Sequence, residues 1–252
     1  MILDIHSHVY LAVPGRALPD FTEIARADLD FLKEQYDAAG ITAAGFSTFP
    51  SVLTDKEILE ENAYLRSVAE EDPRVYQWVV IDPRNDETFR QADEILRDGK
   101  CLGIKIHPKN HQYDINEFGD KIYGYAHEKG AVVVQHPTEY DRLPEFADRY
   151  PNMTMIIAHL GGKNHVEAAL AAKHGNIWVD TSGMASIRNN VVEYAVEKMG
   201  SQRILFGTDT YSAGFQRGRI EYGRLRDEDK ENIFFRNALN LFPGKFDVFI
   251  KG

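Results

Sequence analysis

Two histidines near the start of the chain have the spacing of a metal-binding pair. They lie in the segment Asp4-Ile-His6-Ser-His8. Successive side chains of a β-strand point to opposite faces, so Asp4, His6 and His8 share one face if this segment is a strand. Two imidazoles on one face can bind one metal ion, but chance pairs and buried structural histidines are common. The pair therefore indicates a metal site only if further ligands join it.

Three other polar residues follow apolar runs later in the chain. His136 follows VVVQ, His159 follows MIIA and Asp209 follows ILFGT. Each alone has an ordinary structural explanation, because a histidine can cap a loop and an aspartate can accept backbone N–H groups. Together, imidazole nitrogens and one carboxylate, with a position left open for water, form the ligand set of a catalytic zinc-type site. Their placement after several separate apolar runs favours the catalytic interpretation.

The segments that must position these residues alternate between two kinds. Short apolar runs predict strands over Ile2–Val9, Ile41–Phe49, Val75–Ile81, Cys101–His107, Ala131–His136, Met153–His159, Ile177–Thr181 and Ile204–Thr208. Amphipathic stretches between them predict helices, among them Asp28–Ala39, Asp55–Glu71, Glu87–Asp98, Glu139–Arg149, Val166–His174 and Asn189–Met199. Many of the strands are apolar on both faces, which is typical of a parallel sheet covered by helices.

The predicted fold class is α/β, a (β/α)₈ TIM barrel in one domain over residues 1–252. The length of 252 residues matches the roughly 250 residues of one such barrel. No repeat, low-complexity tract or linker divides the chain. An open, doubly wound sheet is the alternative. In a barrel the active site lies at the carboxyl ends of the strands, where the candidate ligands fall.

Composition limits the partners and the compartment. The net charge is −10, which argues against nucleic acid as a partner. Cys101 is the single cysteine and cannot form an intrachain disulfide, and the N-terminal segment has no secretory-signal pattern. No apolar run approaches the ~18 residues of a membrane-spanning helix. We expect a cytoplasmic protein with a small-molecule substrate and no membrane or nucleic-acid partner, and a homo-oligomer stays open.

The motifs, taken in order, resemble the amidohydrolase superfamily, most of all its small branch of metal-dependent hydrolases and non-oxidative decarboxylases. The segments that carry the resemblance are DIHSH at 4–8, GIKIHP at 103–108, QHP at 135–137, AHLGG at 158–162, FGTD at 206–209 and NALNLF at 237–242. They extend over nearly the whole chain. Each segment alone is unspecific, but their order and spacing are specific.

The resemblance implies one divalent metal ion, zinc or else manganese. The implied ligands are His6, His8, His136 and Asp209. Asp209 is also the implied acceptor of the proton of metal-activated water, and His159 is implied to orient or protonate the substrate. The two implied catalytic residues are therefore Asp209 and His159.

A lysine and a histidine in the fourth predicted strand leave an alternative open. Lys105 and His107 share a face, and binuclear relatives carry a carboxylated lysine in this strand that bridges two metal ions. In that alternative His136 and His159 hold the second ion. We favour the mononuclear site, in which Lys105, His107 and the loop residue Arg16 bind the substrate, a lysine here acting as counter-ion to a negatively charged group.

Two reactions fit this ligand set. A hydrolase directs metal-activated water at an amide, lactone or ester bond of a small, anionic molecule. A non-oxidative decarboxylase of a small carboxylic acid is the alternative, and it uses no water. Loops shorter than those of larger barrel decarboxylases favour hydrolysis by analogy of fold. A barrel that has lost catalysis would lack ligands, and none is missing from the sequence.

Overall fold

The computed structural model describes residues 1–10 and 25–250. Eight parallel strands pair in the order of the sequence from β1 to β8. They are β1 Leu3–Val9, β2 Ala43–Thr48, β3 Val75–Val80, β4 Cys101–Ile106, β5 Val132–Gln135, β6 Thr154–Ile157, β7 Ile177–Asp180 and β8 Ile204–Leu205. The N–H of Ile5 in β1 donates to the carbonyl of Phe206 just after β8, at 2.9 Å. The sheet is thus a nearly closed barrel, and the open-sheet alternative is wrong.

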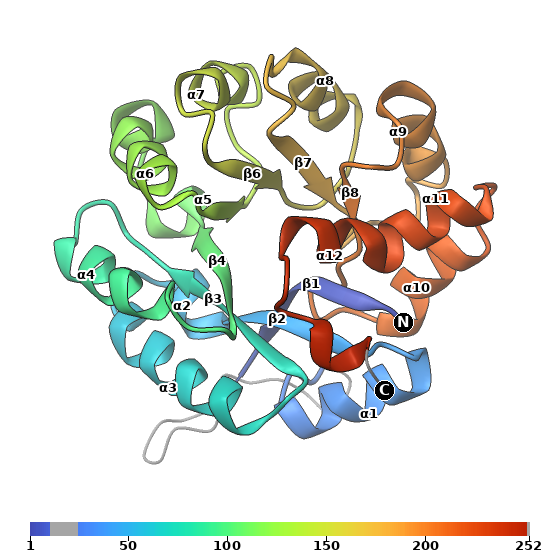
Figure 1. Ribbon diagram of the computed structural model, residues 1–252, viewed down its shortest axis with the longest axis horizontal. Helices are drawn as coiled ribbons and strands as arrows, with labels where there is room; N and C mark the ends of the chain where they lie inside the picture. Colours follow the sequence, from blue (N-terminus) through green and yellow to red (C-terminus); the bar gives the residue numbers. More distant parts are fainter. Residues whose placement is uncertain (11–24, 251–252) are drawn as a thin grey trace.

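Helices surround the strands (Figure 1). The helices that follow the strands include α1 Leu29–Ala39, α3 Ile58–Glu71, α4 Asp86–Ile95, α6 Ile115–Lys129, α7 Leu143–Arg149, α8 Lys163–Ala171, α9 Val191–Met199 and α10 Ala213–Glu221. The structure adds α2 Phe49–Leu53, α5 Pro108–His111, α11 Asp227–Glu231, the π-helical turn η1 Asn232–Arg236, α12 Asn237–Leu241 and the 3₁₀ turn η2 Asp247–Phe249. The six predicted helices named above and all eight predicted strands are confirmed, with ends that differ by a few residues.

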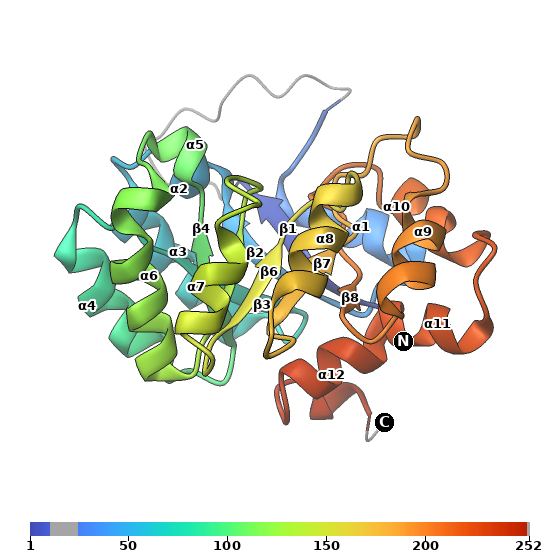
Figure 2. The ribbon, with the colours of Figure 1, turned by 90° about the horizontal axis from the view of Figure 1, so that it is seen from above.

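Two large apolar cores stabilise the barrel within the described part of the chain, beside a small third cluster around Phe49. The larger core lies between the strands and the surrounding helices, and the smaller one fills the barrel interior. Trp78 is buried in the interior, donates from Nε1 to the carbonyl of Ile5 at 2.6 Å, and packs edge-on against Phe242 at 5.9 Å between ring centroids. Phe242 and Phe246 come from the C-terminal segment, and Figure 2 shows that α12 lies on the opposite side of the barrel from α2 and α5. One end of the interior is thereby filled, which leaves the other end for a site.

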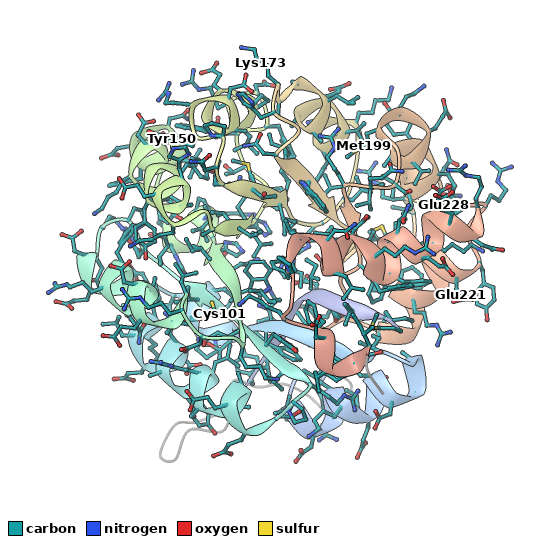
Figure 3. All side chains as sticks on the ribbon, viewed as in Figure 1. Cys101, Tyr150, Lys173, Met199, Glu221 and Glu228 are labelled. Carbon is teal, nitrogen blue, oxygen red and sulfur yellow. The ribbon has the colours of Figure 1, made fainter. Side chains whose placement is uncertain are left out.

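The outer surface is charged. Lys173 and Glu228 lie at the rim of the molecule in Figure 3, whereas Cys101 lies among the strands and is buried. Over residues 1–10 and 25–250, no helix has the length and apolar character needed to cross a membrane.

Candidate metal centre

A buried carboxylate joins the start of β1 to the segment that follows β8. Asp4 accepts hydrogen bonds from the backbone N–H of Thr208 at 3.1 Å and from its hydroxyl at 2.6 Å. Burial raises the pKa of Asp4 to about 7, although the bonds from Thr208 and His6 oppose this shift. Asp4 lies in the same strand as His6 and His8, but its carboxylate joins β1 to the segment after β8 and is not one of the candidate ligands.

A left-handed backbone conformation at Asp209 directs its side chain toward the histidines. Asp209 and Thr210 have φ angles of 57° and 73°, in the left-handed region that side chains other than glycine rarely adopt. The N–H of Asp209 donates to the carbonyl of His6 at 2.9 Å, and the N–H of His8 donates to the Thr210 hydroxyl at 2.7 Å. These two hydrogen bonds hold the strained turn in place. Strained backbone of this kind persists only where surrounding contacts fix it, and it is common at functional sites.

His6, His8 and Asp209 meet at the strand ends. Oδ1 of Asp209 lies 3.2 Å from Nε2 of His8 and 4.0 Å from Nε2 of His6. Two donors that each lie about 2.1 Å from one zinc ion are at most about 4.2 Å apart. Both separations meet that limit. Since two imidazoles and a carboxylate also suit a divalent transition-metal ion, the three residues present fit such an ion.

Burial and neighbouring groups determine the protonation states of His6, His8 and Asp209, and these states favour binding of a cation. The pKa of His6 is lowered to about 3 by burial and by Lys105, against the opposing effect of Asp180. Burial also lowers the pKa of His8. Burial would raise the pKa of Asp209, but the neighbouring His8, His159 and His6 hold it below its usual value. The imidazoles are therefore neutral and the carboxylate is ionised at neutral pH, which are the forms that bind metal.

A cavity of about 250 Å³ opens above these residues. Its lining residues are His8, Phe49, Val52, Leu53, Lys105, His107, Lys109, Asn110, His136, His159, Asp209 and Tyr211. All seven predicted site residues that fall within the described ranges lie at this site: six line the cavity, and His6 belongs to the group beneath it. Arg16, the eighth predicted site residue, lies outside the described residues.

His136 lies near the other candidate ligands, but it does not belong to the group of His6, His8 and Asp209 whose ligand atoms lie close together. Its ring stacks on His107 at 4.1 Å between centroids and lies 5.1 Å from that of His159. Burial and the neighbouring His159 and Lys105 lower its pKa to about 3. Among the described residues, two groups have ligand atoms within 4.8 Å of one another, His6 with His8 and Asp209, and His6 with His159 and Asp180. The role of His136 as a ligand stays a prediction.

Lys105 and His107 both reach the cavity, as their shared face predicts. Nζ of Lys105 lies 2.7 Å from Nε2 of His6, and burial lowers the pKa of this lysine to about 8. Nδ1 of His107 accepts the N–H of Asn110 at 3.2 Å. Because a neutral imidazole carries one proton, Nε2 of His107 is then protonated and can donate to a substrate oxygen. This tautomer suits substrate binding and leaves Nε2 without a lone pair for a metal ion.

Sequence reasoning missed the residues at the end of β7 and directly after it. Asp180, Ser182 and Gly183 contact three of the predicted residues, and Oδ2 of Asp180 lies 2.8 Å from Nδ1 of His6. Burial would raise the pKa of Asp180, but His6, His159 and Ser182 lower it. The signal was present in the sequence, because Asp180 ends an apolar run as His136 and Asp209 do.

Comparison with known families fits this geometry. A protein-family model described as amidohydrolase matches residues 3–244. The chain belongs to the amidohydrolase family. No curated protein matches it.

Solved structures share the fold of this amidohydrolase at low sequence identity. A 2,6-dihydroxybenzoate decarboxylase from Rhizobium has a TM-score of 0.74 and 16% identity, with 100% of this chain and 99% of that chain covered. A probable 2-pyrone-4,6-dicarboxylic acid hydrolase from Acinetobacter baumannii, with citric acid bound, has a TM-score of 0.66 and 16% identity, with 96% and 98% covered. A dihydroxybenzoic acid decarboxylase from Polaromonas sp. JS666, with bound manganese and the inhibitor 2-nitroresorcinol, has a TM-score of 0.68 and 16% identity, with 98% and 97% covered. The fold therefore occurs with both reaction types.

The geometry of Gly183 generates a prediction about the centre. Its φ is +59°, and a Cβ atom there would lie 2.8 Å from Oδ2 of Asp209 and 3.2 Å from Nδ1 of His159. We expect Gly183→Ala to displace the Asp209 carboxylate and to weaken binding of Zn²⁺ by about 10-fold or more. Calorimetric titration with Zn²⁺ and thermal unfolding measure the two effects.

Gly130→Ala is the matched control. Gly130 has a φ of +60° and open space where its Cβ would lie. The left-handed backbone alone should cost this variant about 1–2 kcal/mol of stability, with Zn²⁺ affinity unchanged. Equal Zn²⁺ affinities of the two variants would contradict the proposed contact between position 183 and the centre.

Proposed function

We propose that this amidohydrolase uses one divalent metal ion to hydrolyse an amide, lactone or ester bond in a small, anionic molecule. The observation that carries the proposal is the position of the Asp209 carboxylate. It contacts the candidate ligand His8 at 3.2 Å, its other oxygen lies 3.9 Å from Nδ1 of His159, and it lines the cavity. A single ionised carboxylate thus lies between the metal ligands and the space for a substrate.

The proposed ligands of the ion are His6, His8, Asp209 and, from the family resemblance, His136. Zinc is the first choice for imidazole and carboxylate ligands, with manganese as the alternative. The manganese bound to the Polaromonas enzyme supports the alternative. When bound, such an ion polarises a carbonyl group and lowers the pKa of a coordinated water from 15.7 toward ~7.

Two side chains then handle the protons. Asp209 accepts the proton of the attacking water, and it is available to do so because its neighbours keep it ionised. His159 is partly exposed to the cavity, with 20% of its side chain accessible, and it orients the substrate or relays a proton to the leaving group. The two residues act on opposite ends of the bond that breaks.

The cavity supports a small substrate with a negative charge. A volume of about 250 Å³ is below the ~300–1,000 Å³ of pockets for drug-sized ligands. The Nε2–H of His107 and the ammonium groups of Lys105 and Lys109 supply donors on its wall, whereas Phe49 and Tyr211 supply apolar surface. This combination suits a compact ring or short chain that carries a carboxylate.

Decarboxylation of a small carboxylic acid is the second candidate. The decarboxylases from Rhizobium and Polaromonas share this fold, and the cationic wall of the cavity would also bind a carboxylate that is to be lost. This reaction needs a proton donor toward carbon and no water. The fate of water therefore separates the two candidates.

The first prediction from this proposal concerns metal retention. Purified protein should contain about one divalent ion per chain by elemental analysis, and His136→Ala should lose most of it. His159→Ala should keep the ion and lose ~10²–10⁴ in rate, because it removes only a proton-transfer group. Two ions per chain would favour the carboxylated Lys105 alternative, and equal metal loss in both variants would contradict the mononuclear assignment.

The second prediction concerns the reaction. In H₂¹⁸O, a panel of lactones, amides, esters and aromatic carboxylates should give one product class that carries ¹⁸O, detected by mass spectrometry. Asp209→Asn should lose most turnover even with excess metal, because an amide cannot take the proton from water. Release of CO₂ without incorporation of ¹⁸O, together with recovery of Asp209→Asn by added metal, would replace hydrolysis with decarboxylation.

A further inference from the structure

The end of β7 and the residues directly after it contact the centre from beneath, and the proposed reaction gives them no role. Asp180 and Ser182 are both fully buried, with 0% of each residue exposed. Their polar atoms are directed at His6 and His159, the rings of which stack at 5.1 Å between centroids. The segment therefore contacts a candidate metal ligand and a candidate proton-transfer residue at once.

Asp180 determines which nitrogen of His6 carries the proton. Its Oδ2 lies 2.8 Å from Nδ1 of His6. A carboxylate only accepts hydrogen bonds, so Nδ1 must donate, and Nε2 of the neutral ring keeps a lone pair. The other side of the ring agrees, because the amine of Lys105 lies 2.7 Å from Nε2 and a protonated lysine only donates.

The second carboxylate oxygen of Asp180 holds the surrounding backbone. Oδ1 accepts the N–H of Ser182 at 2.9 Å and the N–H of His159 at 3.1 Å, and it also accepts the Ser182 hydroxyl. His159 has a φ of 62°, so its backbone is strained and depends on such a bond. The position and orientation of both oxygens are thereby fixed by the chain.

Ser182 determines in the same way which nitrogen of His159 carries the proton. Since its hydroxyl donates to Asp180, its lone pairs accept from Nδ1 of His159 at 2.9 Å and lie 3.0 Å from Nδ1 of His6. The backbone carbonyl of Ser182 is a further acceptor, 3.2 Å from Nδ1 of His159. Nδ1 of His159 is therefore protonated, and the lone pair of its Nε2 is the one available for chemistry.

We propose that Asp180 and Ser182 form one positioning unit that holds both His6 and His159 in the Nδ1-protonated tautomer. The unit leaves a lone pair on Nε2 of His6, which the metal ion can bind by displacing Lys105. It also makes His159 enter the reaction as a hydrogen-bond acceptor at Nε2, so His159 can give a proton to the leaving group only after Nε2 has taken one up. The assignment of His6 as a ligand rests on the function proposed above, whereas the tautomers themselves are properties of the chain.

The direct test is the tautomer of each histidine in the metal-free protein. The chain has 9 histidines, and ¹⁵N-histidine labelling with long-range ¹H–¹⁵N correlation distinguishes Nδ1–H from Nε2–H rings. His6→Gln and His159→Gln assign the two signals. In the wild-type protein both rings should be protonated at Nδ1. An Nε2–H ring at either position would overturn the proposal for that residue, and this measurement requires no variant at 180 or 182 to fold.

Asp180→Asn tests the unit by an isosteric change. The backbone N–H groups that face Oδ1 require the amide oxygen there, so the amide nitrogen replaces Oδ2 and donates to Nδ1 of His6. The His6 proton should then move to Nε2, and Zn²⁺ affinity measured by calorimetry should fall about 10–100-fold. An unchanged tautomer with unchanged affinity would overturn the role of Asp180.

A buried aspartate elsewhere provides the matched control. Asp229 accepts from the Ser201 hydroxyl at 2.7 Å and from Nε of Arg226 at 2.8 Å, and neither of these partners belongs to the centre. Asp229→Asn should leave the His6 tautomer and the Zn²⁺ affinity as in the wild type. A change in this variant equal to that in Asp180→Asn would make the effect a general loss of packing and contradict the positioning role.

Ser182→Ala separates the two halves of the unit. It should leave His6 protonated at Nδ1 through Asp180, while an Nε2–H signal appears for His159. A His159 signal that stays wholly Nδ1–H would assign its orientation to the Ser182 carbonyl and overturn the part given to the hydroxyl. Since these readouts need no substrate, failure of the proposed hydrolysis would leave them intact, and their failure would leave the reaction assignment to its own test.

Discussion

The closure of the barrel between β1 and β8 is the constraint on which the centre depends. His6 and His8 lie about 200 positions from Asp209 in the sequence, so these candidate ligands meet only if the first and last strands are neighbours. The bonds of Asp4 to Thr208, and of the Asp209 N–H to the His6 carbonyl, make that junction. The candidate ligands take part in the same few hydrogen bonds. The bond from the Asp209 N–H to the His6 carbonyl helps to close the barrel, and it also holds the turn that brings the Asp209 carboxylate to His8. Folding and assembly of the site are thus one event.

Burial gives the assembled site its charge. Removing the imidazoles of His6, His8 and His136 from water lowers their pKa values and leaves them neutral, while contacts with the histidines keep Asp180 and Asp209 ionised. The result is a buried group with neutral nitrogen donors and negative oxygens, which a divalent cation would stabilise. Lys105 is the nearest positive group in the structure described, bonded to His6 at 2.7 Å. A metal ion at His6 would therefore have to displace this contact, so the lysine and the ion compete for one nitrogen.

The sequence predicted most of the barrel and much of the centre. Periodicity identified the eight strands, because strands that are apolar on both faces have a strong local signal. The rule that barrel sites lie at the strand ends correctly selected His6, His8, His159 and Asp209 as neighbours. Local pattern could not identify the roles of Asp180, Ser182 and Gly183. These residues contact His6, His159 and Asp209, which are distant in sequence and become their neighbours only when the barrel forms. The left-handed backbone at His159 and Asp209 also depends on contacts between distant segments. The short helices α2, α5 and α11 were missed because segments of four or five residues carry too little periodicity.

The central claim is that one divalent ion binds at the junction of β1 and β8. Crystals grown with Zn²⁺ and measured on both sides of the zinc absorption edge test it most directly, because anomalous difference density locates the ion and its ligands independently of any substrate. We expect one peak per chain, with Nε2 of His6, Nε2 of His8 and a carboxylate oxygen of Asp209 each about 2.0–2.2 Å away. Two peaks bridged by a modified Lys105, or one peak away from His6, His8 and Asp209, would contradict it.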